Sequence, residues 1–368
     1  MYISNKDYPN KQSCLYYGEI YNCAINQIND VDDIKNINGD YCLVLCKDDC
    51  LIAATDPFRT QLLFYNIDTE KQSFAFSNDP RELKRRGFFP YPLEPNTILM
   101  LDFKTFNFVK HTNKVWDLTQ KDKTNTKVFD AIEQSVGFRY NDKSKLMLSD
   151  GYDSGVTACA LWKQGHTNFS ISFETYNKEL PIDRKIIKQR LLLHKGIFMP
   201  TRSVDLTEIY NVYKQPVIKD DLSECYCIGI DYLKKRNIDS IITAYGGAYY
   251  MDYGFKGRQF NGNSYFGGLF PNDLRLVYPR ITHGTHMNLS SIYMIALLKG
   301  TIFKQSILDP QVVQAWINTS SDLKNKRDRN WMWEYMTEHN YPFNSGIETV
   351  EDKLENVDEW TSWETDYF

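Results

Sequence analysis

Short apolar runs separated by turn residues dominate the first third of the chain. They recur about every ten positions at residues 41–44, 51–54, 62–65 and 74–77, and a further run follows at residues 97–103. Runs of this length and spacing are typical of β-strands that pair with their neighbours in sequence. This region therefore predicts an N-terminal domain rich in antiparallel β-sheet.

The pattern changes after a polar stretch at residues 119–127. Residues 128–140 place apolar side chains three and four positions apart, as on one face of a helix. Beyond this helix, segments with strand and helix patterns alternate along the chain. That order predicts a doubly wound parallel sheet that binds ligands at the carboxyl ends of its strands. We therefore expect an α/β fold with two domains, residues 1–120 and 121–368. The further strands are expected at residues 145–148, 168–173 and 240–243, and the further helices at residues 155–163, 185–194 and 225–236.

Composition and charge narrow the classes of function. The 368 residues are 42% hydrophobic and carry a formal net charge of −4, so the chain can fill two cores and has no overall positive field for nucleic acid. No apolar run approaches the ~18 residues of a membrane span, and the polar start of the chain lacks a signal-peptide core. We expect a cytoplasmic protein that acts on small molecules, without membrane or nucleic-acid partners; its oligomeric state stays open.

The turn between the strand at residues 145–148 and its helix carries the residues best suited to chemistry. After Leu148, Ser149 and Ser154 supply hydroxyls, and Asp153 supplies a carboxylate. The N-terminus of a helix binds anions, and a carboxylate beside it can hold a Mg²⁺ ion that shields phosphates. The alternative is an ordinary turn in which serine and aspartate cap the helix.

This turn resembles the S-G-G-x-D-S pyrophosphate loop of the N-type ATP pyrophosphatases, with Gly151 matched and Asp150 in place of the other glycine. Other segments resemble asparagine synthetases in that family's order. They begin with YGEIYN at residues 17–22, which is similar to the family's N-G-E-I-Y-N signature, and the resemblance covers about 300 residues. It implies a truncated, class II glutaminase-like domain of the Ntn-hydrolase type, followed by an ATP pyrophosphatase (PP-loop) domain.

The resemblance fails at the residues that would hydrolyse glutamine. Class II glutaminases use an N-terminal cysteine as the nucleophile. This chain begins Met1-Tyr2, and Tyr17 and Thr55 stand where the family has asparagine and arginine. We therefore expect no glutaminase activity, unless a cysteine-bearing segment precedes Met1.

A second segment, TAYGGAY from Thr243, resembles the phosphate-side motif S-G-E-G-S-D-E of asparagine synthetases. The match implies that Thr243 and Gly246 border the nucleotide. Tyr245 takes the place of a glutamate, as in β-lactam synthetase, a relative in which a tyrosine paired with an acid deprotonates the attacking amine. Asp273 is the carboxylate nominated to help Tyr245; alternatively, Tyr245 is a packing residue.

The function implied is an ATP-dependent carbon–nitrogen ligase like the enzyme of asparagine biosynthesis. A carboxylate would be adenylated with release of pyrophosphate, and ammonia or an amine would then form the amide. Asp153 would hold Mg²⁺, and Tyr245 and Asp273 would be catalytic. The residues that would bind ATP are Leu148, Ser149, Gly151, Asp153, Ser154, Thr243 and Gly246.

Residues that differ from the family pattern leave other hypotheses of function open. Tyr245, together with Ala248 in place of a metal-binding aspartate, argues for a substrate other than that of asparagine synthetase. Asp150, Ala248 and Phe343, the last in place of a lysine, favour a binding or scaffold protein that kept the fold without the chemistry. A further hypothesis, besides the ligase and the scaffold protein, is a PP-loop enzyme that adenylates a nucleobase or a peptide.

Overall fold

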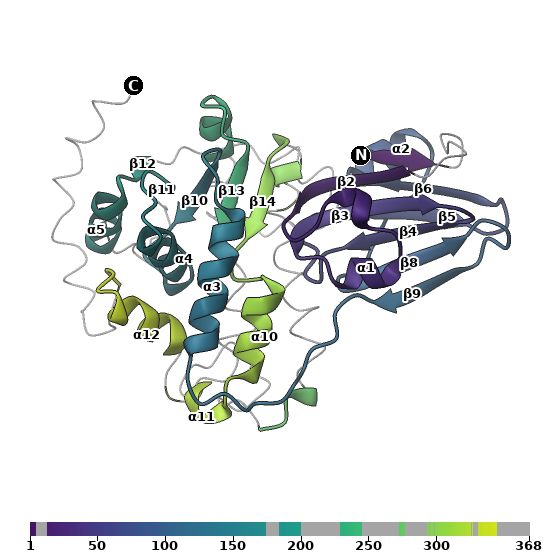
Figure 1. The fold of residues 1–368 in the computed structure, drawn as a ribbon. Helices are drawn as coiled ribbons and strands as arrows, with labels where there is room; N and C mark the ends of the chain where they lie inside the picture. The colour runs from purple at the N-terminus through teal and green to yellow at the C-terminus, as the bar shows by residue number, and fades with distance from the viewer. Residues whose placement is uncertain are drawn as a thin grey trace, which may run out of the picture.

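The computed structural model describes residues 1–4, 13–173, 184–199, 229–244, 272–276, 293, 295–297, 299–324, 326 and 330–343. The elements form a β-rich part, residues 1–112, and an α/β part that begins at residue 126 (Figure 1). Among the described residues, no helix has both the length and the apolar character needed to cross a membrane.

The β-rich part contains two antiparallel sheets, with the strand orders β2-β3-β4-β8-β9 and β1-β6-β5-β7. Two short helices, α1 and α2, accompany them. The bounds are β1 (Tyr2–Ser4), β2 (Ser13–Ile20), α1 (Val31–Lys35), β3 (Gly39–Lys47), β4 (Cys50–Thr55), β5 (Phe64–Asp68), β6 (Ser73–Ser77), α2 (Pro80–Arg85), β7 (Tyr91–Pro92), β8 (Thr97–Asp102) and β9 (Phe108–Thr112).

Strand β3 is buried on both faces, which explains why the sequence of this region contains continuous apolar runs. Its even-numbered residues, such as Val44, pack with Phe74 and Phe76 of β6 in the core between the sheets. Its odd-numbered residues, such as Leu43, pack with Ile34 of α1 in a second core on the other face. Both faces of the strand are buried, so both sets of side chains are apolar.

The α/β part is built on a five-stranded parallel sheet with the order β12-β11-β10-β13-β14. Strand β11 follows β10 on one side, and β13 lies on its other side. The strand order therefore reverses between β10 and β13, which is the position at which open α/β sheets bind ligands. The bounds are β10 (Ser144–Leu148), β11 (Ser170–Phe173), β12 (Ile197–Met199), β13 (Ser240–Thr243) and β14 (Ile302–Gln305).

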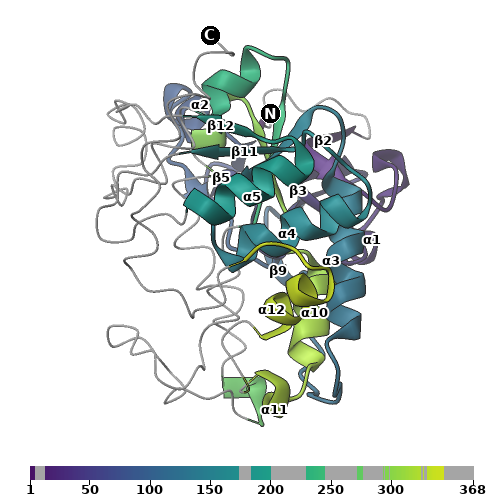
Figure 2. The ribbon, with the colours of Figure 1, turned by 90° about the vertical axis from the view of Figure 1, so that its left-hand side faces the viewer.

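Helices cover this sheet and complete the larger core. Figures 1 and 2 show α3, α4, α5 and α10 on the same side of the sheet, where α3 lies between α4 and α10 and α12 packs on α4. Apolar residues of α12, among them Met336, join the core beneath α4. The bounds are α3 (Thr126–Arg139), α4 (Tyr152–Lys163), α5 (Arg184–His194), α10 (Pro310–Asn318), α11 (Ser321–Lys324) and α12 (Asn330–Glu338).

The two parts meet where β14 approaches β3. Arg139 of α3 is buried there between two carboxylates, 2.9 Å from Asp40 and 2.7 Å from Asp309. Lys304 of β14 is also buried and forms an ion pair of 2.8 Å with Glu19 of β2. Charges removed from water need such partners, so the ion pairs with Asp40 and Glu19, both in the β-rich part, fix the α/β part against it.

The predicted antiparallel region and the predicted parallel sheet are both present, but several boundaries differ. The helix expected from residue 155 begins at Tyr152, and of the strand expected at residues 62–65 only Phe64 and Tyr65 belong to β5. The helix expected at residues 225–236 is described from residue 229 onward. Strand β14 was not predicted, because its four residues include the buried, charged Lys304.

Candidate functional site

The turn after β10 lies at the point where the sheet reverses its strand order. Leu148 ends β10, and α4 begins at Tyr152 after an extended N-cap residue, Gly151. The Gly155 N–H donates the first helical hydrogen bond of α4, to the Gly151 carbonyl at 3.1 Å. The N-terminal end of α4, with the positive end of its dipole, therefore opens onto the turn.

Two serines hold the turn closed. The Ser149 N–H donates to Ser154 Oγ at 3.0 Å, and the two hydroxyl oxygens are 2.8 Å apart. Ser149 Oγ also accepts the Gly151 N–H at 3.2 Å. Gly151 has an ordinary extended backbone, but a Cβ there would lie 3.3 Å from Ser149 Oγ. The local sequence thus builds a compact turn of hydroxyls and amides in which Ser154 is buried.

Arg190 of α5, which the sequence analysis did not nominate, lies behind this turn. It is fully buried. Its Nη1 donates to the carbonyls of Ser149 at 2.6 Å and Gly151 at 3.0 Å. The only signal in the sequence was an arginine between Ile187 and Leu191 on the apolar face of the expected helix.

Thr243 lies at the end of the neighbouring strand, β13. Because Leu146 of β10 is paired with Ile242 of β13, Leu148 and Thr243 end adjacent strands. The Thr243 carbonyl accepts the Ser306 N–H at 3.1 Å, which links the ends of β13 and β14. The structure therefore brings five of the nominated residues together in one turn and places Thr243 on the strand beside it.

The other nominated residues are placed differently. Tyr245 and Gly246, like Ala248, lie outside the described residues. Asp273 is exposed and forms an ion pair with Arg275, whose hydrogen bonds and charge lower the pKa of this carboxyl to about 2. A carboxylate with so low a pKa is a weak proton acceptor near neutrality. Its pairing with Tyr245 stays a prediction.

The donor set for a metal is limited. Asp153 is in the first turn of α4, and among the described residues no three His, Cys, Asp or Glu side chains form a cluster suited to a metal ion. Mg²⁺ is commonly held by one or two carboxylates together with the phosphates of a nucleotide. Asp153 fits that mode of binding.

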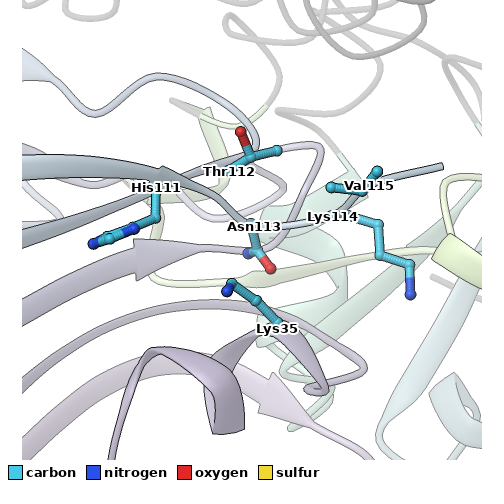
Figure 3. A pocket seen from close by; sticks show the side chains of 6 residues that line it. All are labelled: Lys35, His111, Thr112, Asn113, Lys114 and Val115. Atoms are coloured by element: carbon cyan, nitrogen blue, oxygen red, sulfur yellow. The ribbon is translucent and has the colours of Figure 1, made fainter.

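A cavity of about 420 Å³ lies elsewhere, in the β-rich part (Figure 3). Lys35 comes from α1, and the other lining residues come from β9 and the segment that follows it. In Figure 3, the side chains of His111 and Lys114 point in opposite directions. None of the residues that line the cavity belongs to the turn after β10, so the cavity does not extend the candidate site. Its lining residues are Lys35, His111, Thr112, Asn113, Lys114 and Val115.

The segment that begins YGE in β2 faces the α/β part. The Tyr17 hydroxyl donates to the Thr301 carbonyl at 3.3 Å, and burial raises the pKa of Tyr17 to about 12. Gly18 has φ +102°, and a Cβ there would lie 2.0 Å from the Asp40 carbonyl oxygen. Only glycine fits this backbone without strain.

Comparisons with known proteins give little further guidance. No family model and no curated protein matches the chain. An allosteric regulatory enzyme of purine biosynthesis aligns at 10% identity and a TM-score of 0.21, covering 46% of this chain and 49% of its own. Glutamine phosphoribosylpyrophosphate amidotransferase from B. subtilis, complexed with ADP and GMP, aligns at 8% identity and a TM-score of 0.21, covering 58% and 50%. The chain spans about half the length of each, and such remote similarity assigns it neither a family nor a function.

Proposed function

We propose that this chain is an ATP-dependent carbon–nitrogen ligase that adenylates a carboxylate at the turn after β10. The observation that carries the proposal is the position of that turn. Residues 149–154, which resemble a pyrophosphate loop, occupy the carboxyl end of the strand at which the sheet order reverses. The sequence resemblance to asparagine synthetases supplies the reaction class.

The chemistry follows from the groups in the turn. The N-terminus of α4 and the hydroxyls of Ser149 and Ser154 would bind the β- and γ-phosphates of ATP. A carboxylate oxygen of the substrate attacks the α-phosphorus, and pyrophosphate leaves. Ammonia or an amine then attacks the acyl carbon and gives up a proton, for which Tyr245 is the nominated acceptor, and AMP leaves with the electrons of the broken C–O bond. Mg²⁺ held by Asp153 and the phosphates would offset the negative charge on the leaving pyrophosphate.

The proposal assigns the β-rich part no glutaminase chemistry. Thr55, at the place of the family's arginine, is buried, and its hydroxyl donates to the Asp56 carbonyl at 3.1 Å. Tyr17, at the place of the family's asparagine, is engaged with Thr301. We infer that this part is a glutaminase-like domain without activity, and that nitrogen enters as free ammonia or as an amine.

The test is pyrophosphate release from ATP and Mg²⁺ with a panel of amino acids, other carboxylates, nucleobases and peptides, with ammonia supplied. We expect release that depends on one carboxylate and is lost in Asp153→Ala. Asp150→Ala is the matched control, since Asp150 departs from the loop pattern, and this variant should retain release. Dependence on a nucleobase or a peptide would move the proposal to another PP-loop reaction.

A second candidate is a nucleotide-binding protein without ligase chemistry. The observation that favours it is the pairing of Asp273, the acid nominated to help Tyr245, with Arg275, which lowers the pKa of Asp273 to about 2 and makes it a weak proton acceptor. Stabilisation of the fold by ATP and Mg²⁺ without pyrophosphate release on any substrate would support this candidate, because a ligand that binds only the native state raises Tm.

A further inference from the structure

Arg190 connects three segments that are far apart in the sequence. Besides the carbonyls of Ser149 and Gly151, its Nε donates to the Pro342 carbonyl at 2.8 Å. The guanidinium also lies 5.5 Å from the ring centre of Tyr341. One buried side chain of α5 thus contacts the turn after β10 and the segment that follows α12.

The contacts of Arg190 determine which way the turn presents its amides. In a trans peptide unit, the carbonyl and the following N–H point in opposite directions. With the Ser149 and Gly151 carbonyls directed at Arg190, the N–H groups of Asp150 and Tyr152 are directed to the opposite side of the turn. N–H groups that point to one side of a turn at a helix N-terminus can bind an anion.

The packing of α4 against Arg190 depends on Gly155. A Cβ at this position would lie 2.5 Å from Arg190 Nη2 and 2.9 Å from Met336 Sδ. Glycine therefore allows the first turn of α4 to approach the guanidinium. The positive charge of Arg190 consequently lies directly behind the turn, on the side away from the amides.

We propose that Arg190 is a positioning residue that sets the turn after β10 for the polyphosphate of the nucleotide. The inference deepens the proposed function and rests on it. Arg190 touches the loop carbonyls, not the phosphates, and acts by fixing the loop and by placing one positive charge behind it. Lysine, a point charge with a narrower reach, cannot reproduce the forked contacts with Ser149, Gly151 and Pro342.

The experiment measures binding of ATP and of inorganic pyrophosphate, each with Mg²⁺, by calorimetry. Arg190→Lys should weaken both by about tenfold or more. Tyr341→Phe is the matched control, because it removes the 3.1 Å contact between the Tyr341 hydroxyl and His194 Nε2 and leaves the loop carbonyls bound. This control should bind as the wild type does.

Steady-state kinetics distinguish a positioning role of Arg190 from a lower fraction of folded protein in the variant. In Arg190→Lys the KM for ATP should rise while kcat at saturating ATP stays close to that of the wild type, whereas a smaller folded fraction would lower kcat and leave KM unchanged. If Arg190→Lys does not fold, Gly155→Ala, which displaces the guanidinium without removing it, should weaken binding in the same direction.

The two proposals fail in different ways. If the wild type binds ATP and both Arg190→Lys and Gly155→Ala bind it equally well, the role of Arg190 is overturned and the proposed function stands. If the wild type binds neither ATP nor pyrophosphate, both proposals are overturned.

Discussion

Replacing Gly155 by alanine tests how tightly α4 is fitted against Arg190. Two effects oppose each other. Alanine is favoured over glycine inside a helix by about 1 kcal/mol. The added Cβ, however, would lie 2.5 Å from Arg190 Nη2, 2.9 Å from its Cζ and 2.9 Å from Met336 Sδ. Overpacking of this kind costs about 1–3 kcal/mol.

The clash should outweigh the helix preference, because Arg190 is fully buried and held by three carbonyls, so it cannot move aside freely. We expect Gly155→Ala to lower the free energy of unfolding by about 1–2 kcal/mol. Urea unfolding followed by circular dichroism measures this change.

Gly137 of α3 provides the control. It is exposed, and the nearest atom to an added Cβ is Gln164 Oε1 at 3.4 Å. Gly137→Ala should therefore raise the free energy of unfolding by up to about 1 kcal/mol. If Gly155→Ala were as stable as Gly137→Ala, the close approach of α4 to Arg190 would be refuted.

Two further predictions concern buried charges. Burial lowers the pKa of His194 to about 3, so as the pH falls the unfolded chain binds a proton at this imidazole before the folded chain does. The contribution of neutral His194 to the free energy of unfolding is therefore fully present above about pH 6.5 and is lost as the pH falls toward 3. Thermal unfolding at pH 7.5 and 5 should show a loss about 2 kcal/mol larger for the wild type than for His194→Gln, and equal losses would contradict it. Glu19→Gln removes the negative charge that pairs with the buried Lys304 at 2.8 Å and leaves its ammonium with neutral acceptors, among them the Arg139 carbonyl and the Ser144 hydroxyl at 3.0 Å. It should cost about 2 kcal/mol, against about 1 kcal/mol for Lys304→Met. Urea unfolding of both variants decides this, and the reverse order would show that the ion pair does not hold the two parts together.

The elements that sequence patterns predicted best are those whose residues follow one uniform hydrophobic pattern. Strands β3 and β4 are apolar because nearly all their residues are buried, and the strands and helices from α3 to β11 alternate as expected. Strand β14 was not predicted, because the charged Lys304 is buried in it only by virtue of its ion pair with Glu19, which belongs to a strand far away in the sequence. No local pattern contains that partner.

The candidate site shows the same division. The turn at residues 149–154 is recognisable from its local residues, because serines, glycine and a helix N-terminus form one contiguous unit. Arg190 was missed because its partners lie 41 and 152 positions away along the chain. Asp273 was nominated from its sequence position alone, and the structure pairs it with Arg275, two residues further on.

The proposed reaction begins with adenylation of a carboxylate at the turn after β10. ATP–pyrophosphate exchange measures this step directly, because labelled pyrophosphate enters ATP only when the adenylate forms and reverses, whichever amine follows. We expect exchange that requires Mg²⁺ and one carboxylate, persists in Asp150→Ala and is lost in Asp153→Ala. Absence of exchange across the carboxylate panel, or undiminished exchange in Asp153→Ala, would contradict it.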